Sequence, residues 1–217
     1  MASQWPRGRS EYRTILILDI EGYGDSARSD AIRAWLRGQL RQVVRAALAG
    51  AGIGEVRYTA HSTGDGLLVT IDPSVGKPRI LGAVLDNLAT GLREQNRLAG
   101  PAENLRLRAV LHAADLLIDP DGPLGEQVNF AFELLDAEEL RILLKAASGP
   151  LIVCVTDAVY RQVIVQRHEG LDPSAFEAVW LECKRTCELG WVRAPGEAGV
   201  VARGEAALAI LQNERTG

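Results

Sequence analysis

The amino-acid sequence predicts a single α/β domain in which a mostly antiparallel sheet is covered by helices. Apolar runs typical of strands alternate with segments of helical periodicity, and no linker-like segment separates them. Two short apolar runs flank an Asp-Gly turn within residues 56–71, which predicts a β-hairpin. Residues 104–114 alternate between apolar and polar side chains, as in a strand with one polar face. The hairpin argues against the second candidate, a doubly wound parallel sheet.

Each element has a local reason in the sequence. Residues 14–18 (TILIL) are an unbroken apolar run, typical of a strand that is buried on both faces. Ser26 or Ser29 can cap the helix that follows, and the glycines from Gly50 onward end it. The further elements are expected at about 56–60 and 67–71 (strands), 80–97 (helix), 104–114 (strand), 126–147 (helix), 151–155 (strand), 157–166 (helix), 176–183 and 190–193 (strands) and 203–214 (helix).

The composition is that of a globular protein and excludes several function classes. The 217 residues are 47% hydrophobic, which is enough for a core without a disulfide or a metal. A net charge of −4 predicts no nucleic-acid partner. No apolar run reaches the roughly 18 residues of a membrane span, and the N-terminus has no apolar leader. Together with an odd number of cysteines, three, these features predict a cytoplasmic protein with no membrane partner.

Two acidic turns suggest a site at one edge of the sheet. Asp19 follows the buried strand 14–18, and Asp65 lies in the hairpin turn. If these strands are neighbours, both carboxylates meet at one edge, where their repulsion requires a cation. Mg²⁺ suits such a place because it binds few carboxylates together with substrate phosphates, and a second ion would permit in-line displacement at phosphorus. The alternative is that these acidic, glycine-rich turns are ordinary turns.

The sequence as a whole resembles the catalytic domain of class III nucleotidyl cyclases over about residues 14–193. The similarity rests on five motifs that occur in the order of that family. The two metal motifs are LDIEGYGD and STGDGLLV. They are followed by a strand with a His, LRLRAVLHAADLL, a helix start, GEQVNFAFELLDA, and a closing hairpin, ECKRTCELGWV. The chain is also similar to stand-alone actinobacterial cyclase-like proteins.

This resemblance implies a fold, an activity and an assembly. The fold is a palm-type, ferredoxin-like βαββαβ core over residues 13–195, with a flexible segment 1–12 before it and a tail 196–217, which can be helical, after it. The activity is conversion of a nucleoside triphosphate into a 3′,5′-cyclic nucleotide and pyrophosphate. Such a product would be a second messenger, for example in stress or antiphage signalling. The assembly is a head-to-tail homodimer with composite sites at the interface.

The resemblance also implies roles for individual residues. Asp19 and Asp65 would hold two Mg²⁺ or Mn²⁺ ions, helped by the carbonyl group of Ile20. From the other subunit, Asn129 would orient the ribose and Lys184 would neutralise the terminal phosphates. Lys184 is equally well explained as a solvated strand lysine. The backbone N–H groups expected to bind the triphosphate belong to Gly22, Tyr23 and Gly24.

One departure from the family concerns a charge. Four residues after Asn129 the family has an arginine that stabilises the transition state, whereas this chain has Glu133. A carboxylate there would repel the phosphates, and loss of such an arginine costs about 10³-fold or more in related phosphoryl transfers. Arg106 or Arg108 could take over that role, whereas Arg141 is two turns further along and could point elsewhere.

A second departure concerns base recognition. Purine-cyclising relatives read the base with a lysine and an aspartate, and this chain has His61 and Gly122 at those positions, with Asp121 adjacent. A lysine only donates hydrogen bonds and a carboxylate only accepts them, so their loss removes the usual readout of adenine. The base is then another one, for example a pyrimidine, or no base is used productively.

Two functions therefore stay open. The metal residues and Asn129 favour an active cyclase, a phosphorus–oxygen lyase. Glu133 and the missing base-reading pair favour a catalytically degenerate module that binds a nucleotide or a partner protein in regulation or defence signalling. A palm-type polymerase or a diguanylate cyclase is less well supported, because the chain lacks their Gly-Gly-Asp/Glu-Glu-Phe type of turn. His112 is expected to be a hydrogen-bonded core residue.

Overall fold

The structure is a computed structural model that describes residues 9–120, 122–184 and 186–216. Its strands are β1 (Arg9–Ile20), β2 (Tyr58–Ser62), β3 (Gly66–Ile71), β4 (Leu107–Asp119), β5 (Gly122–Leu124), β6 (Leu151–Thr156), β7 (Glu177–Glu182) and β8 (Cys187–Arg193). Its α-helices are α1 (Asp30–Gly50), α2 (Lys77–Arg79), α3 (Leu85–Asn96), α4 (Glu126–Asp136), α5 (Glu138–Ala146), α6 (Asp157–Val159) and α7 (Val200–Thr216). Single π-helical turns extend α2 into α3 and follow α6.

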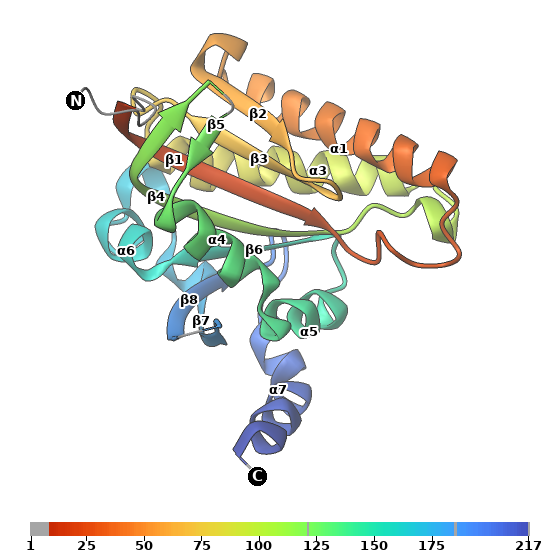
Figure 1. The fold of residues 1–217 in the computed structure, drawn as a ribbon. Coiled ribbons are helices and arrows are strands. Elements are labelled where there is room, and N and C mark those ends of the chain that lie inside the picture. The colour runs from red at the N-terminus through yellow and green to blue at the C-terminus, as the bar shows by residue number, and fades with distance from the viewer. Residues whose placement is uncertain (1–8, 121, 185, 217) are drawn as a thin grey trace, which may run out of the picture.

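The strands form one mixed sheet, as Figure 1 shows. The strand order is β2-β3-β1-β4-β6-β8-β7, and β5 pairs with β4 beside this path. Every neighbouring pair is antiparallel except β4 and β6. The sequence β1-α1-β2-β3-α3-β4, with the spatial order β2-β3-β1-β4, is a ferredoxin-like βαββαβ core. The predicted fold class is therefore confirmed, and the parallel alternative is wrong.

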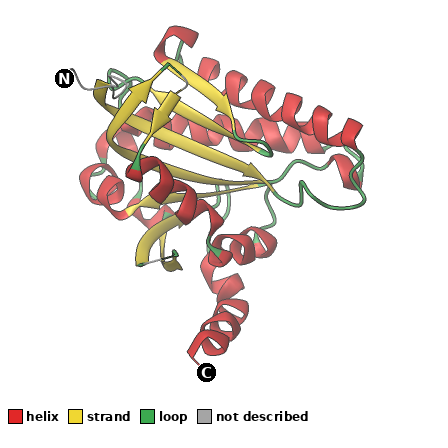
Figure 2. Cartoon of the chain, in the orientation of Figure 1, coloured by secondary structure: helices red, strands yellow, loops and turns green. Residues whose placement is uncertain are grey.

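Helices cover both faces of the sheet (Figures 1 and 2). Helices α1 and α3 pack on one face, and α4, α5 and α7 pack on the other. Strand β1 explains why the TILIL run is apolar throughout. Leu16 and Leu18 belong to the core under α1 and α3, whereas Ile15 and Ile17 belong to the core under α4 and α5. A strand with helices on both sides must be apolar at every position, because successive side chains point to opposite faces.

Most elements occur where the sequence predicts them, but several begin or end at other residues than expected. Ser29, and not Ser26, caps α1, and its side chain accepts a hydrogen bond from the Ile32 N–H at 3.4 Å. Strand β1 starts at Arg9, so the expected flexible segment 1–12 includes four residues of strand, while residues 1–8 lie outside the described residues. The helix expected at 126–147 is two helices, because Ala137 adopts an extended conformation between α4 and α5.

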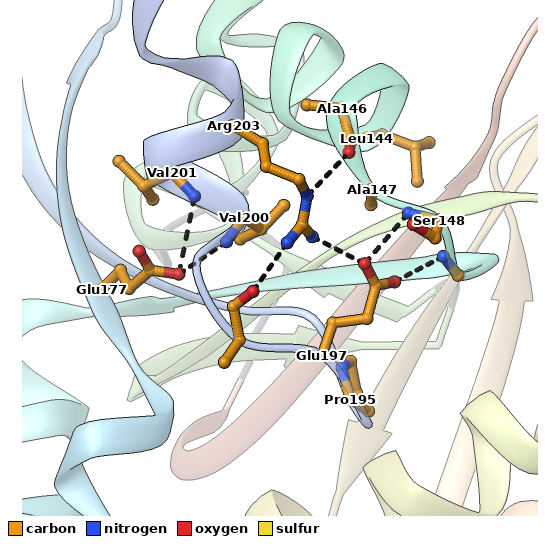
Figure 3. A network of polar contacts seen from close by, with 12 residues as sticks. Leu144, Ala146, Ala147, Ser148, Glu177, Pro195, Glu197, Val200, Val201 and Arg203 are labelled. Carbon is orange, nitrogen blue, oxygen red and sulfur yellow. Dashed lines mark hydrogen bonds and ion pairs between the residues drawn. The ribbon is translucent and has the colours of Figure 1, made fainter.

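Helix α7 is fixed to the domain by a polar network at its start (Figure 3). The Glu197 carboxylate accepts a hydrogen bond from the Ser148 N–H at 3.0 Å and pairs with the Arg203 guanidinium at 2.7 Å. Arg203 also donates to the Ala146 carbonyl at the end of α5, at 3.2 Å. The Glu177 side chain in β7 caps α7 by accepting from the Val200 N–H at 2.9 Å. The tail of the chain is thus helical and docked against α5.

Candidate functional site

Strand register brings the two predicted metal ligands to one edge of the sheet. Asp19, near the end of β1, lies opposite Gly66 of β3 on one side and opposite Arg108 of β4 on the other. Asp65 directly precedes Gly66, in the turn between β2 and β3. A side chain at position 66 would collide with the Leu18 carbonyl oxygen, so only glycine permits this close strand contact. The expectation that the two acidic turns are neighbours is supported by this register.

A cleft of about 270 Å³ opens at this edge between the sheet and the junction of α4 and α5. Its charged lining residues are Asp19, Asp65, Arg108, Asp136 and Arg141. Asp136 and Arg141 stand on either side of the break at Ala137, and their side chains form an ion pair at 3.8 Å. The cleft therefore contains both signs of charge, and it is lined by the end of β1, the turn before β3, the start of β4 and residues of α4 and α5.

Asp19 and Arg108 form the least exposed ion pair of the cleft. Their side chains are only 14% and 9% exposed, and Arg108 Nη2 contacts Asp19 Oδ2 directly. Arg108 Nη1 donates to the Leu135 carbonyl, 3.1 Å away, in the last turn of α4. A cation is favourable there because the carbonyl end of a helix carries partial negative charge. Arg108 thus joins the acidic edge of the sheet to the end of α4.

The pKa of Asp19 is raised above its ordinary value. Burial is the largest cause, and the charges of Asp65 and Asp136 act in the same direction, while Arg108 opposes them. Arg108 has a larger effect on this pKa than Asp65 or Asp136, so the net rise comes from burial of the carboxylate. A further cation bound here would lower the pKa of Asp19 and stabilise the ionised carboxylates.

The donor groups fit a divalent cation that binds substrate phosphates as well as protein. Asp65 contributes an exposed carboxylate, and Asp19 retains one oxygen beside the one that contacts Arg108. The Ile20 carbonyl accepts a long hydrogen bond from the Tyr23 N–H at 3.3 Å. Within the described part of the chain, no group of three or more His, Cys, Asp or Glu side chains could hold a metal ion. Such a sparse set suits Mg²⁺ or Mn²⁺ with waters and phosphates, not a closed protein cage.

The turn after β1 leaves backbone donors available. Gly22 has a positive φ of 62°, which glycine adopts without strain. Arg28 and Arg33 hold the turn by donating to the carbonyls of Glu21 and Tyr23, at 2.7 and 3.2 Å. The Tyr23 N–H donates to the Ile20 carbonyl within the turn. The N–H groups of Gly22 and Gly24 have no partner among the described residues.

The structure separates the two arginines proposed to replace the missing one. Arg108 lines the cleft, whereas Arg106 donates to the carbonyls of Leu144 and Ala147 at the end of α5. Both of these bonds come from Nη2, and Nη1 of Arg106 pairs with Glu21 at 3.3 Å. Arg106 is therefore committed to holding α5 against the start of β4, and Arg108 is the arginine that faces the acidic edge.

The residues expected to contact ribose and terminal phosphates lie away from this cleft within one chain. Asn129 is exposed in the first half of α4, and Lys184 is exposed in the turn between β7 and β8. Glu133 is half-buried, and its charge helps to raise the pKa of Cys183, the residue before Lys184, to about 11, after burial and Glu188. The cleft that contains Asp19 and Asp65 is not lined by Asn129, Glu133 or Lys184.

The two positions at which purine-cyclising relatives would carry their base-reading residues, His61 and Gly122, lie next to each other. A Cβ atom at Gly122 would lie 3.1 Å from the His61 ring, so the imidazole occupies the space beside this glycine. Gly122 has a φ of 130°, which a residue with a side chain rarely adopts. Asp121 lies outside the described residues. His112 is buried and bonded on both ring nitrogens, at 3.1 Å to Thr156 and 2.9 Å to Gln127, so the expected structural role is confirmed.

Solved structures of nucleotidyl cyclases have a fold similar to that of this chain. No family model and no curated protein matches the sequence. Among solved structures, an adenylate/guanylate cyclase/hydrolase from Silicibacter pomeroyi matches 87% of this chain and 99% of its own, with 20% identity and a TM-score of 0.60. The guanylyl cyclase Cya2 matches 88% of this chain and 95% of its own, with 16% identity and a TM-score of 0.62.

A third structure, the guanylate cyclase domain of RhGC from Catenaria anguillulae in complex with GTP, matches 85% of this chain and 97% of its own. Its identity is 17% and its TM-score 0.53. The chain thus has a class III nucleotidyl cyclase-like fold. In the described residues, no helix is both long and apolar enough to cross a bilayer.

Proposed function

We propose that the protein is a metal-dependent nucleotidyl cyclase that acts as a homodimer in the cytoplasm. The observation that carries this proposal is the register that sets Asp19 opposite both Gly66 and Arg108, with Asp65 next in the turn. This register gathers two carboxylates and one guanidinium in a single cleft. The fold supports the same function, because the structural neighbours are cyclase domains.

The reaction would be an intramolecular displacement at phosphorus. The 3′-hydroxyl oxygen of a nucleoside triphosphate attacks the α-phosphorus, the bond to the β-phosphate breaks, pyrophosphate leaves and the hydroxyl proton is released. Asp19, Asp65 and the Ile20 carbonyl would hold one or two Mg²⁺ or Mn²⁺ ions, which supply positive charge beside the phosphates when bound. Arg108 adds a fixed positive charge at the same place.

The other half of the site would come from the second copy. Asn129 would orient the ribose, and Lys184 would neutralise the terminal phosphates. Both are exposed and neither reaches the acidic cleft of its own chain, which agrees with a site shared between two copies. The Gly22 and Gly24 N–H groups are free to bind the triphosphate. The product would be a second messenger in a signalling pathway such as antiphage defence.

A second candidate is a nucleotide-binding module without turnover. The observation that favours it is Glu133, a negative charge on α4 that acts on Cys183, the residue before Lys184. That charge would weaken attraction to the phosphates at the expected place of a cationic residue. This candidate predicts that nucleotide and metal bind but no cyclic product forms.

Incubation with each of the four nucleoside triphosphates and Mn²⁺, followed by mass spectrometry, tests the proposal. We expect cyclic nucleotide and pyrophosphate in equal amounts from at least one of them. Asp19→Asn and Asp65→Asn should each lower the rate at least about 100-fold, because they remove charge that binds the cation. Asp115→Asn, an exposed aspartate further along β4, is the matched control and should keep the wild-type rate. Bound nucleotide without product from any triphosphate would favour the non-catalytic module.

A further inference from the structure

A cavity of about 340 Å³ lies at the same end of the sheet as the acidic cleft, but it shares no lining residue with that cleft. It lies where the end of α3, the segment before β4 and the loop between α5 and β6 come together. The Asn96 side chain bonds to the N–H and carbonyl groups of Leu105, at 2.8 and 2.9 Å. The Leu107 N–H donates to the Pro150 carbonyl at 2.8 Å. The walls of this cavity are therefore held by hydrogen bonds between elements.

The lining of this cavity carries positive charge. Its charged residues are Arg93, Arg97 and Arg106, and none of its described lining residues is an Asp or a Glu. Arg93 and Arg97 come from the end of α3, one turn apart, and Arg106 comes from the segment before β4. Like charges that are gathered at one place disfavour one another, and a bound anion would compensate them.

The carboxylates closest to this cavity along its walls already have cationic partners. Glu21 pairs with Arg106 Nη1 at 3.3 Å. Glu197 accepts a hydrogen bond from the Ser148 N–H at the cavity wall and pairs with Arg203 at 2.7 Å (Figure 3). Neither carboxylate forms an ion pair with the two arginines of α3.

The cavity offers N–H donors that nothing in the described part of the chain uses. The Arg97 guanidinium and the side-chain amide of Asn104 have no partner among the described residues. Arg93 donates to uncharged acceptors, the nearer of which is the Pro195 carbonyl at 3.2 Å. Glu94, the neighbour of Arg93 on α3, lines a different groove, between α1 and α3. The positive charge of the two α3 arginines is therefore left without a carboxylate.

These groups fit a phosphate group on a small molecule. A guanidinium binds phosphate oxygens through paired N–H groups, and the amide of Asn104 adds a neutral donor. A volume of about 340 Å³ is near the lower end of the range for small-molecule sites, so the ligand is small. Cations are also favoured at the carbonyl end of any helix, which is a simpler reason for Arg93 and Arg97. That reason does not explain why they share one cavity with Arg106 and Asn104.

We propose that this cavity binds a small phosphate-bearing anion, either inorganic phosphate or a phosphate monoester. The inference does not depend on the proposed function, because no residue of the acidic cleft takes part. Arg106 connects the two places, since its Nη1 atom pairs with Glu21 in the turn that follows β1. An anion in the cavity would lie beside a residue that holds this turn.

Calorimetric titration of the full chain with inorganic phosphate and with glycerol 3-phosphate tests this site. Divalent cations are removed beforehand, so that the carboxylates of the acidic cleft do not attract phosphate through a metal, and the ionic strength is held constant. The variants are Arg97→Gln and Arg93→Gln. Arg79→Gln is the matched control, because Arg79 is exposed on α2 and does not line the cavity. Thermal unfolding of each protein is recorded without phosphate.

We expect at least one of the two ligands to bind one-to-one with a Kd below about 1 mM. The ligand that binds more tightly identifies the source of the phosphate group. Arg97→Gln and Arg93→Gln should each weaken binding at least about tenfold, the effect of one lost charge-assisted hydrogen bond, and Arg79→Gln should stay within about twofold of the wild type. Because the Arg97 side chain has no partner among the described residues, Arg97→Gln should unfold at the wild-type temperature.

Several results would overturn the inference. The first is that neither ligand binds to the wild type in a one-to-one ratio. The second is that Arg97→Gln and Arg93→Gln bind as the wild type does, or that Arg79→Gln loses as much affinity as they do, since the arginines then act only through overall charge. The third is a gain of about tenfold in Asp65→Asn, which would place the phosphate in the acidic cleft. None of these results decides the cyclase proposal, which is tested by product formation in that cleft.

Discussion

At the scale of single residues, the Asp19–Arg108 pair determines what the cleft can bind. Both side chains are largely withdrawn from water, and Arg108 also satisfies a carbonyl at the end of α4. Burial still raises the pKa of Asp19, although the effect of Arg108 is larger than the repulsion from Asp65. A divalent cation bound beside both carboxylates would favour their ionised forms.

Removal of the arginine should therefore destabilise the protein. Arg108→Gln leaves the Asp19 carboxylate buried without its cation, and we expect the free energy of unfolding at pH 7 to fall by about 3 kcal/mol. Arg161→Gln removes an ion pair to Asp157 in which the arginine side chain is 71% exposed, and the loss should be under about 1 kcal/mol. Urea unfolding of both variants measures the difference. A loss in Arg108→Gln no larger than in Arg161→Gln would mean that the buried pair is not coupled to folding.

At the scale of elements, His112 of β4 connects this strand with β6 and with α4. Its ring nitrogens bond to Thr156 at the end of β6 and to Gln127 in the first turn of α4, and the ring meets Phe130 edge to face at 5.4 Å. Helix α4 carries Asn129 and ends at the carbonyl bound by Arg108. The position of α4, and with it one wall of the cleft, therefore depends on a histidine inside the sheet.

This arrangement predicts a pH dependence of stability. Burial lowers the pKa of His112, against the opposing hydrogen bond to Gln127. Because the folded pKa lies below the unfolded value of about 6.5, the unfolded state takes up the proton first as the pH falls. The contribution of His112 is complete above about pH 6.5 and is lost on acidification, with a slope of at most about 1.4 kcal/mol per pH unit.

Unfolding free energies measured between about pH 8 and pH 5 test this expectation. The wild type should lose stability on acidification in this range, and His112→Gln should show a smaller loss. His168→Gln, which changes an exposed histidine, should follow the wild type. A His112→Gln profile parallel to that of the wild type would contradict the assignment of this titration to His112.

Local signals in the sequence were enough for the core elements and for the acidic edge. The Asp-Gly turn fixed the β2–β3 hairpin, and the apolar run 14–18 marked the doubly covered strand, so Asp19 and Asp65 could be placed together. The break at Ala137 had no such signal, because the residue is neither glycine nor proline and the helical pattern continues across it. Arg141 was therefore not expected in the cleft.

Thr70 illustrates what a pattern cannot reveal. A threonine in an apolar strand is an ordinary β-branched residue, and nothing in its neighbours along the chain marks it as unsatisfied. Its Oγ1 atom is buried without a partner among the described residues, in a strand whose neighbours β1 and β2 are brought together only by the fold. Likewise, the sequence did not distinguish Arg106 from Arg108. In the structure Arg106 binds the carbonyl end of α5 and Arg108 binds that of α4, because these two helix ends lie beside β4.

At the scale of the whole molecule, the proposed cyclase would carry two halves of its site on different parts of one chain. Asp19, Asp65 and Arg108 line the cleft at one edge of the sheet, whereas Asn129 and Lys184 are exposed elsewhere. In a dimer with twofold symmetry, the same two surfaces of each copy meet twice, so two complete sites can form. The cyclase proposal therefore requires residues from both copies in every active site.

Mixing two inactive variants is the most direct test of this account. Asp65→Asn removes one half of the site and Asn129→Ala removes the other, and each protein alone should form almost no cyclic nucleotide. After random exchange of subunits, half of the dimers contain one copy of each and hold one intact site of two, so the equal mixture should recover about a quarter of the wild-type rate. A mixture that stays as inactive as its components, or a wild type that converts none of the four nucleoside triphosphates, would contradict the account.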